Sequence, residues 1–209
     1  MIDIQRRSPI SLLGRPVTTE SRDRWTVVLE YDAEGAGPWL IDLSHRPQWD
    51  LQDRNISHIT PFGISMPRKP GTCRLEDGIL LSRMNETQAS LCRLGGGVPE
   101  VPEGSAYTET TEAYAFLALV GKNVFSITEK LTSLDLADPR KSLPFLLQGP
   151  VSHVPSQMVV LKRDGLDGIV LLRCPRGYGH DMVRSIFDAG AEFGLRPAGE
   201  SALGKAMKS

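Results

Sequence analysis

The second half of the chain alternates between continuous apolar runs and helical periodicity. Residues 113–120 are almost wholly apolar, which is typical of a buried strand. Asn123 can cap a helix, and apolar side chains then recur every three or four positions, at Val124, Ile127, Leu131 and Leu134. Two strands and a second helix are predicted to follow, at residues 154–161, 169–173 and 180–189, and residues 195–199 begin a last short strand or a tail.

Strand, helix, strand, strand, helix, strand is the order of a split β-α-β unit, the ferredoxin-like arrangement. We therefore predict an α+β fold with a ferredoxin-like domain over residues 106–209. Both helices of such a unit pack on the same side of its sheet. The apolar stripes of the two helices should then be buried together, namely Val124, Ile127, Leu131, Met182, Val183, Ile186 and Phe187.

The first half of the chain is rich in β-forming residues. Residues 1–22 are polar and broken by prolines, which predicts a surface arm, and Asp77-Gly78 predicts a hairpin turn. Residues 85–88 (Asn-Glu-Thr-Gln) have the form of a capping box and predict a short helix that ends at Gly95. Strands are predicted at residues 25–31, 39–43, 48–52, 72–76 and 79–82. The glycine- and proline-rich residues 95–105 predict a linker that closes a β-rich N-terminal region, 1–105.

Composition narrows the class of protein. The formal net charge is −1 and 23% of residues are charged. The overall charge of the protein therefore does not favour binding to nucleic acid. No apolar run reaches the roughly 18 residues that a membrane-spanning helix needs, and the polar residues 1–7 lack the apolar stretch typical of a secretion signal. Three cysteines at wide spacing fit neither a disulfide framework nor a zinc cluster. We expect a cytoplasmic protein with free thiols and no metal site.

Candidate chemistry is sparse, and the residues themselves indicate no catalytic centre. The four histidines are scattered, and no nucleotide-binding or hydrolase motif is present. Asp42, Ser44 and His45 lie at a predicted strand end, where polar groups can face a ligand crevice, and Ser44 and His45 are also ordinary residues for the start of a turn. Asp135 follows the first predicted helix and His153 precedes a strand, and both positions are also ordinary for solvent-facing turns.

Several stretches resemble one family. Residues 40–45 (Leu-Ile-Asp-Leu-Ser-His), 119–123 and 131–135 resemble the folate-binding fold of the glycine-cleavage T-protein, an aminomethyltransferase. Residues 171–178 (Leu-Leu-Arg-Cys-Pro-Arg-Gly-Tyr) and 187–195 are more similar to the gamma subunit of heterotetrameric sarcosine oxidase. The opening Arg-Arg-Ser-Pro and the short length agree with that subunit. The resemblance implies tetrahydrofolate as the ligand of the fold, and candidate ligand-binding residues Asp42, Ser44, His45, Asp135, His153 and Arg176.

The chain also departs from the T-protein pattern. T-proteins are much longer and carry a catalytic carboxylate after a Gly-Gly-Val turn, whereas the matching residues 149–153 here read Gly-Pro-Val-Ser-His. The resemblance therefore implies a non-catalytic subunit that docks on larger flavin- and folate-dependent partners of one-carbon metabolism and binds no cofactor alone. The alternative is a small stand-alone folate-dependent aminomethyltransferase that uses His153 or Asp135 to handle a proton.

Overall fold

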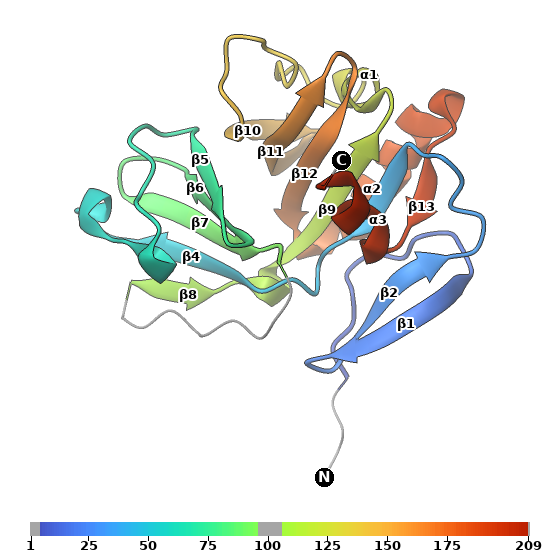
Figure 1. Cartoon of the computed structure of the whole chain (residues 1–209), viewed down its shortest axis with the longest axis horizontal. Helices are drawn as coiled ribbons and strands as arrows, with labels where there is room; N and C mark the ends of the chain where they lie inside the picture. The colour runs from blue at the N-terminus through green and yellow to red at the C-terminus, as the bar shows by residue number, and fades with distance from the viewer. Residues whose placement is uncertain (1–4, 96–105, 209) are drawn as a thin grey trace.

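The computed structural model describes residues 5–95 and 106–208, so most of the predicted linker at 95–105 lies outside the described residues. Three sheets and three α-helices form a mixed α+β fold within these ranges, as the sequence predicts. The helices are α1 (Val124–Glu129), α2 (Gly179–Gly190) and α3 (Glu200–Ala206). Figure 1 shows the strands of the largest sheet at the centre, with a smaller sheet beside it and a hairpin near the N-terminus.

The central sheet has six strands in the order β10-β11-β12-β9-β3-β13. Neighbouring strands run antiparallel except for β3 and β13, which are parallel. The strands are β3 (Trp39–Asp42), β9 (Tyr114–Gly121), β10 (Phe145–Val151), β11 (Val154–Asp164), β12 (Asp167–Pro175) and β13 (Arg196–Ala198).

One strand of the first half lies inside the predicted ferredoxin-like unit. β3 pairs with both β9 and β13, so it separates two strands that the ferredoxin-like order would place side by side. Leu40 and Ile41 of β3 point to opposite faces and both are fully buried. A strand that is apolar on both faces needs cover on both, which a central position supplies. β10 is a further addition, because the sequence pattern did not predict it.

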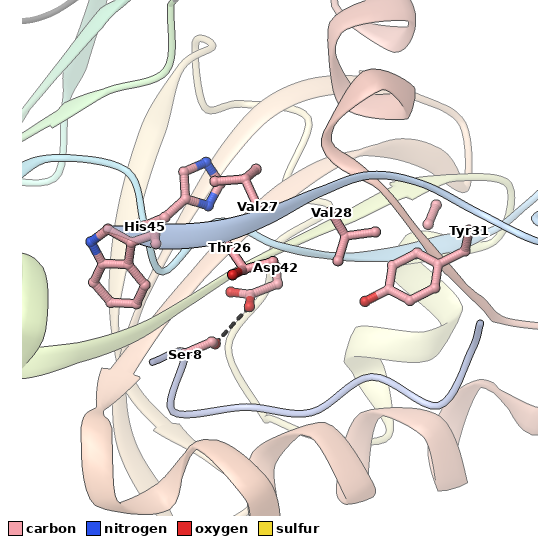
Figure 2. A pocket seen from close by; sticks show the side chains of 9 residues that line it. Ser8, Thr26, Val27, Val28, Tyr31, Asp42 and His45 are labelled. Carbon is pink, nitrogen blue, oxygen red and sulfur yellow. Dashed lines mark hydrogen bonds between the residues drawn. The ribbon is translucent and has the colours of Figure 1, made fainter. Parts of the chain in front are cut away.

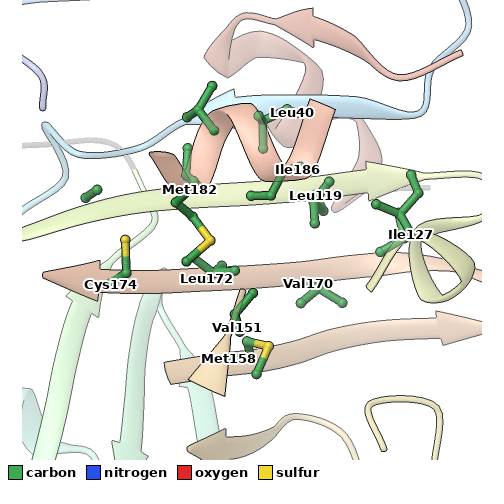
Figure 3. Close-up of a cluster of buried hydrophobic side chains, with 14 of the residues drawn as sticks. Leu40, Leu119, Ile127, Val151, Met158, Val170, Leu172, Cys174, Met182 and Ile186 are labelled. Atoms are coloured by element: carbon green, nitrogen blue, oxygen red, sulfur yellow. The ribbon is translucent and has the colours of Figure 1, made fainter. Parts of the chain in front are cut away.

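Helices α1 and α2 cover one face of the central sheet. The buried cluster beneath them contains Val124, Ile127, Met182, Val183 and Ile186, as predicted (Figure 3). Leu131 and Phe187 are only partly buried at its margin. The predicted helix through Leu134 is wrong in length, because α1 ends at Glu129 and Leu134 packs on the cluster from the following loop.

The other face of the central sheet packs against α3 and the five-stranded sheet, β5-β6-β7-β4-β8. Those strands are β4 (Gln48–Gln52), β5 (Cys73–Glu76), β6 (Ile79–Arg83), β7 (Gln88–Arg93) and β8 (Tyr107–Glu109). Side chains alternate between the two faces of the five-stranded sheet. Leu80 and Cys92 face the central sheet, whereas Leu81 and Leu91 belong to a separate cluster on the opposite face of the five-stranded sheet.

The predicted helix after Asn85 is wrong, because this segment is the turn and second strand of a hairpin. The Asn85 Oδ1 atom accepts hydrogen bonds from the backbone N–H of Thr87, at 2.9 Å, and from its hydroxyl. An asparagine that bonds two residues ahead stabilises a turn as well as a helix cap. In β7, Ala89 and Leu91 then face one side and Ser90 and Cys92 the other, which is the period of a strand.

The N-terminal hairpin, β1 (Pro16–Arg22) and β2 (Trp25–Tyr31), forms a two-stranded sheet by itself. The predicted irregular arm is therefore partly wrong, since residues 16–22 pair with β2. Trp25, Val27 and Tyr31 of β2 are buried, whereas every β1 residue before Arg22 is exposed. Figure 1 shows the hairpin at the edge of the molecule. Among the described residues, no helix has the length and apolar character to cross a membrane.

Candidate functional site

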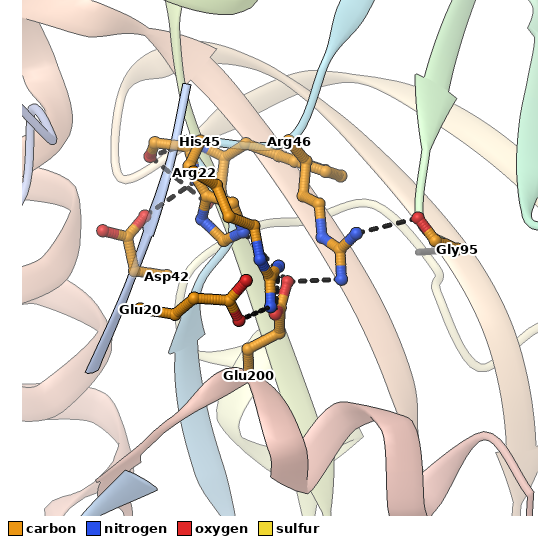
Figure 4. Close-up of polar contacts among 9 residues, drawn as sticks. Glu20, Arg22, Asp42, His45, Arg46, Gly95 and Glu200 are labelled. Carbon is orange, nitrogen blue, oxygen red and sulfur yellow. Dashed lines mark hydrogen bonds and ion pairs between the residues drawn. The ribbon is translucent and has the colours of Figure 1, made fainter. Parts of the chain in front are cut away.

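The polar residues at the end of β3 meet a buried carboxylate from the last helix. Glu200 is the first residue of α3 and is 7% exposed. Its Oε1 atom lies 2.9 Å from Nε2 of His45 and also contacts the guanidinium group of Arg46. Its Oε2 atom lies 2.5 Å from Nη1 of Arg22, at the end of β1. We call these four residues the Glu200 cluster (Figure 4).

The electrostatics of the Glu200 cluster favour the ionised carboxylate. Burial raises the pKa of Glu200, but the hydrogen bonds from His45 and Arg22 and the charge of Arg46 outweigh it and bring the pKa to about 2. Burial lowers the pKa of Arg46. The Nη1 atom of Arg46 also donates to the carbonyl oxygen of Gly95, at 2.9 Å. The cluster thus ties β1, the loop after β3 and α3 to one another.

Asp42 lies next to the Glu200 cluster and has its own partners. Its carboxylate accepts a hydrogen bond from the hydroxyl of Ser8 at 2.6 Å and from the backbone N–H of Ser44 at 2.8 Å. Burial raises the pKa of Asp42, and these hydrogen bonds partly offset the increase. The hydroxyl of Ser44 accepts a hydrogen bond from the backbone N–H of Phe116, at 3.1 Å, and this bond connects the end of β3 to β9.

A cavity of about 30 Å³ lies among Asp42, His45, Tyr31 and β2 (Figure 2). A space of this size holds a water molecule, which needs about 10–15 Å³, but not a pterin ring. Asp42 could exchange a proton with such a water. Neither the cavity nor the engaged side chains around it offer room for a larger reactant.

The other predicted site residues lie elsewhere. The Asp135 Oδ1 atom accepts from the backbone N–H of Ala137, at 3.1 Å, and the residue lines an open cavity of about 290 Å³ beyond α1. His153 is exposed in the turn between β10 and β11 and has a positive φ of 69°. Arg176 follows β12, and its Nη2 atom donates to the carbonyl oxygen of Arg7, at 2.6 Å. The structure therefore brings only Asp42, Ser44 and His45 together.

Sequence reasoning missed Arg22, Arg46 and Glu200, which complete the cluster. Glu200 is separated from His45 by 155 positions and from Arg22 by 178, so no local pattern connects them. It also missed Arg173, a buried arginine of β12. One signal for Arg173 was available: it is the single charged residue in an otherwise apolar strand, Ile169 to Cys174.

The three cysteines are free and buried. Burial raises the pKa of both Cys73 and Cys92 to about 12, and that of Cys174 to about 11. Thiols with such pKa values are protonated at neutral pH and are poor nucleophiles. Within residues 5–95 and 106–208, no three histidine, cysteine, aspartate or glutamate side chains are grouped as a metal site.

Comparison with known proteins identifies the fold. No protein-family model and no curated protein match the sequence. Among solved structures, a chain of heterotetrameric sarcosine oxidase from Corynebacterium sp. U-96, in complex with pyrrole 2-carboxylate, has a TM-score of 0.59 and 14% identity. The match covers 77% of this chain and 89% of that one.

The second similar structure is the glycine cleavage system aminomethyltransferase T from Bartonella henselae, with a TM-score of 0.57 and 15% identity. It covers 88% of this chain, but this chain spans only 56% of the aminomethyltransferase. The protein thus has a fold found in a sarcosine oxidase chain and in an aminomethyltransferase. The resemblance expected from the sequence is confirmed at the level of the fold.

Proposed function

We propose that this chain is a non-catalytic subunit of a hetero-oligomeric complex and docks on larger protein partners through its N-terminal hairpin. The partners would carry the flavin- and folate-dependent chemistry of one-carbon metabolism, in the cytoplasm. The observation that carries the proposal is the unpaired edge of β1, with two exposed apolar side chains, Leu13 and Val17, at or just before its start. The similarity to nearly the full length of a chain from a heterotetrameric oxidase supports the same function.

The hairpin has the features of a docking element. Leu13, just before β1, is 83% exposed, and Val17 within β1 is 62% exposed. Strand β1 pairs with β2 on one side, and β2 is its only partner strand among the described residues. An unpaired strand edge with exposed apolar side chains is a template for another chain. Burial of β2 residues Trp25 and Tyr31 holds the hairpin against the rest of the molecule.

The candidate site supports a structural role over catalysis. Arg22, His45 and Arg46 all contact the carboxylate of Glu200, and Asp42 bonds Ser8 and Ser44. Catalytic groups need a reactant within hydrogen-bond reach. In the Glu200 cluster and at Asp42 the polar side chains bond one another, and the adjoining cavity of about 30 Å³ has room for water but not for a larger reactant.

The test is stoichiometric co-purification from the native host with the hairpin altered. We expect wild-type chain to purify with larger subunits at a fixed ratio, and Leu13→Asp with Val17→Asp to reduce the yield of that complex at least tenfold. A charge placed in an apolar interface costs several kcal/mol of binding. Leu166→Asp is the matched control, because Leu166 is 51% exposed in the turn between β11 and β12. Docking through this hairpin would be refuted if the control variant lost as much of the complex as the hairpin variant, or if the hairpin variant lost none of it.

A second candidate, a folate-dependent transferase, is favoured by one observation, the cavity of about 290 Å³ beside Asp135. Its volume approaches the roughly 300 Å³ at which small-molecule sites begin, and Asp135 supplies a carboxylate. Calorimetric titration of the isolated chain with tetrahydrofolate separates the two functions. Micromolar binding that Asp135→Asn abolishes would make the enzyme the better proposal, and the docking subunit predicts no such binding.

A further inference from the structure

We propose that the cavity between the two larger sheets, beside Arg173, binds a small inorganic anion, with chloride as the ion that fits it. The cavity measures about 20 Å³. Its polar lining comes from Gln48, Ser82, Ser90, Gln157 and Arg173. We call it the inter-sheet cavity. It is separate from the Glu200 cluster and plays no part in the docking proposed above.

Strand alternation explains why polar groups meet here. Val170, Leu172 and Cys174 of β12 point to the helix-covered face, so Arg173 points to the opposite face, towards the five-stranded sheet. Gln157 of β11 is its neighbour in register. From the other sheet, Ser82 pairs with Ser90 across β6 and β7. Two polar positions of each sheet therefore face each other across the interface.

Arg173 carries a buried positive charge without a carboxylate partner. The residue is 6% exposed, and its guanidinium carbon lies 3.9 Å from the centre of the Tyr114 ring. The Nη1 atom makes a long hydrogen bond, 3.5 Å, to Oε1 of Gln48. No ion pair of Arg173 is found in the described part of the chain. The carboxylate of Asp50 acts on Arg173 only through its charge, without contact, and accepts hydrogen bonds from Gln52 and Gln88. A buried charge is costly unless an opposite charge accompanies it.

Two donors beside this charge lack an acceptor. The Nε atom of Arg173 and the Nε2 atom of Gln48 are buried and make no hydrogen bond within the described structure. Ser82 also lines the cavity, and its hydroxyl lies 3.2 Å from the Cys73 sulfur. The Cys92 thiol cannot supply negative charge, because burial raises its pKa to about 12.

The size and lining of the cavity select the ligand. Donors without acceptors need a hydrogen-bond acceptor, and the buried cation beside them favours an acceptor with negative charge. Leu80, Val159 and Leu171 make the rest of the wall apolar, which suits a weakly hydrated spherical ion. A space of about 20 Å³ has no room for the four oxygens of sulfate or phosphate. Chloride satisfies each of these conditions.

Chloride binding to the folded state should raise thermal stability by mass action. We expect the unfolding midpoint of the wild-type chain to be about 3 °C or more higher in sodium chloride than in sodium gluconate of equal ionic strength. Arg173→Met should abolish this difference. Arg184→Met, at an exposed position of α2, is the control for general salt effects and should retain the full difference.

Crystals of the wild-type chain soaked in bromide provide the direct test, independent of whether Arg173→Met folds. We expect an anomalous peak within hydrogen-bond distance of Arg173 Nε and Gln48 Nε2. A peak absent at this position, with water in its place, would overturn the proposal. So would a chloride effect on the unfolding midpoint that is equal in the wild type and in Arg173→Met.

Discussion

Replacing Glu200 with alanine should lower the free energy of unfolding by about 3–5 kcal/mol at pH 7, because it leaves the buried Arg46 guanidinium group without its counter-charge and other buried polar groups without an acceptor. Arg46 and His45 are the partners most affected, since their side chains are 12% and 7% exposed. Urea denaturation followed by circular dichroism measures the change. Glu192→Ala is the control: Glu192 pairs with Lys130 at the surface, where an ion pair contributes about 1 kcal/mol at most.

The contribution of Glu200 should depend on pH in a definite direction. Its pKa is lowered to about 2 by its partners, below the ordinary value of about 4.3 for an unfolded chain. The stabilisation is therefore fully present above about pH 5 and is lost as the pH falls towards 2. The difference in stability between the wild type and Glu200→Gln should shrink over that range. A difference that stays constant from pH 7 to pH 2 would contradict the electrostatic role of Glu200.

Replacing Gly199 with alanine should destabilise the fold by about 1–3 kcal/mol, because the glycine lies directly on the backbone of β2. An added Cβ would lie 2.2 Å from the carbonyl carbon and oxygen of Leu29 and 2.4 Å from the nitrogen of Glu30. Backbone atoms cannot move aside as the end of a side chain can. Helix α3, which begins at the next residue, would have to move away from the hairpin.

Gly204→Ala is the matched control for Gly199→Ala, since a Cβ there meets no atom within 4 Å. Gly204 lies inside α3, where alanine favours the helix by about 0.5–1 kcal/mol. Urea denaturation of both variants should therefore give changes of opposite sign. Equal and small effects at the two positions would show that α3 does not press on β2 as described.

The parts of the fold that follow from local pattern were predictable. The apolar run of β9 and the stripes of Val124, Ile127, Met182 and Ile186 predicted one buried face under two helices. Local chemistry was ambiguous at Asn85, because the same side-chain hydrogen bond that caps a helix also closes a turn. The place of β3 between β9 and β13 depends on long-range pairing, which periodicity does not encode.

The candidate site was predictable only where its residues are close in sequence. Asp42, Ser44 and His45 follow a strand, so their common location could be inferred. Glu200 could not, because it reaches His45 through the packing of α3 against β2 and β3. The chemistry of its imidazole alone predicts a proton-handling role for His153, whereas the structure places His153 in an exposed turn with a positive φ.

Hydrogen exchange on the native complex tests the central proposal, docking through the N-terminal hairpin, most directly. Amides of β1 (Pro16–Arg22) that do not bond β2 should exchange at least about tenfold more slowly in the complex than in the isolated chain, because a partner covers that edge. The turn at Leu166 should exchange at the same rate in both. Unchanged exchange along β1, with new protection elsewhere on the surface, would contradict the proposal.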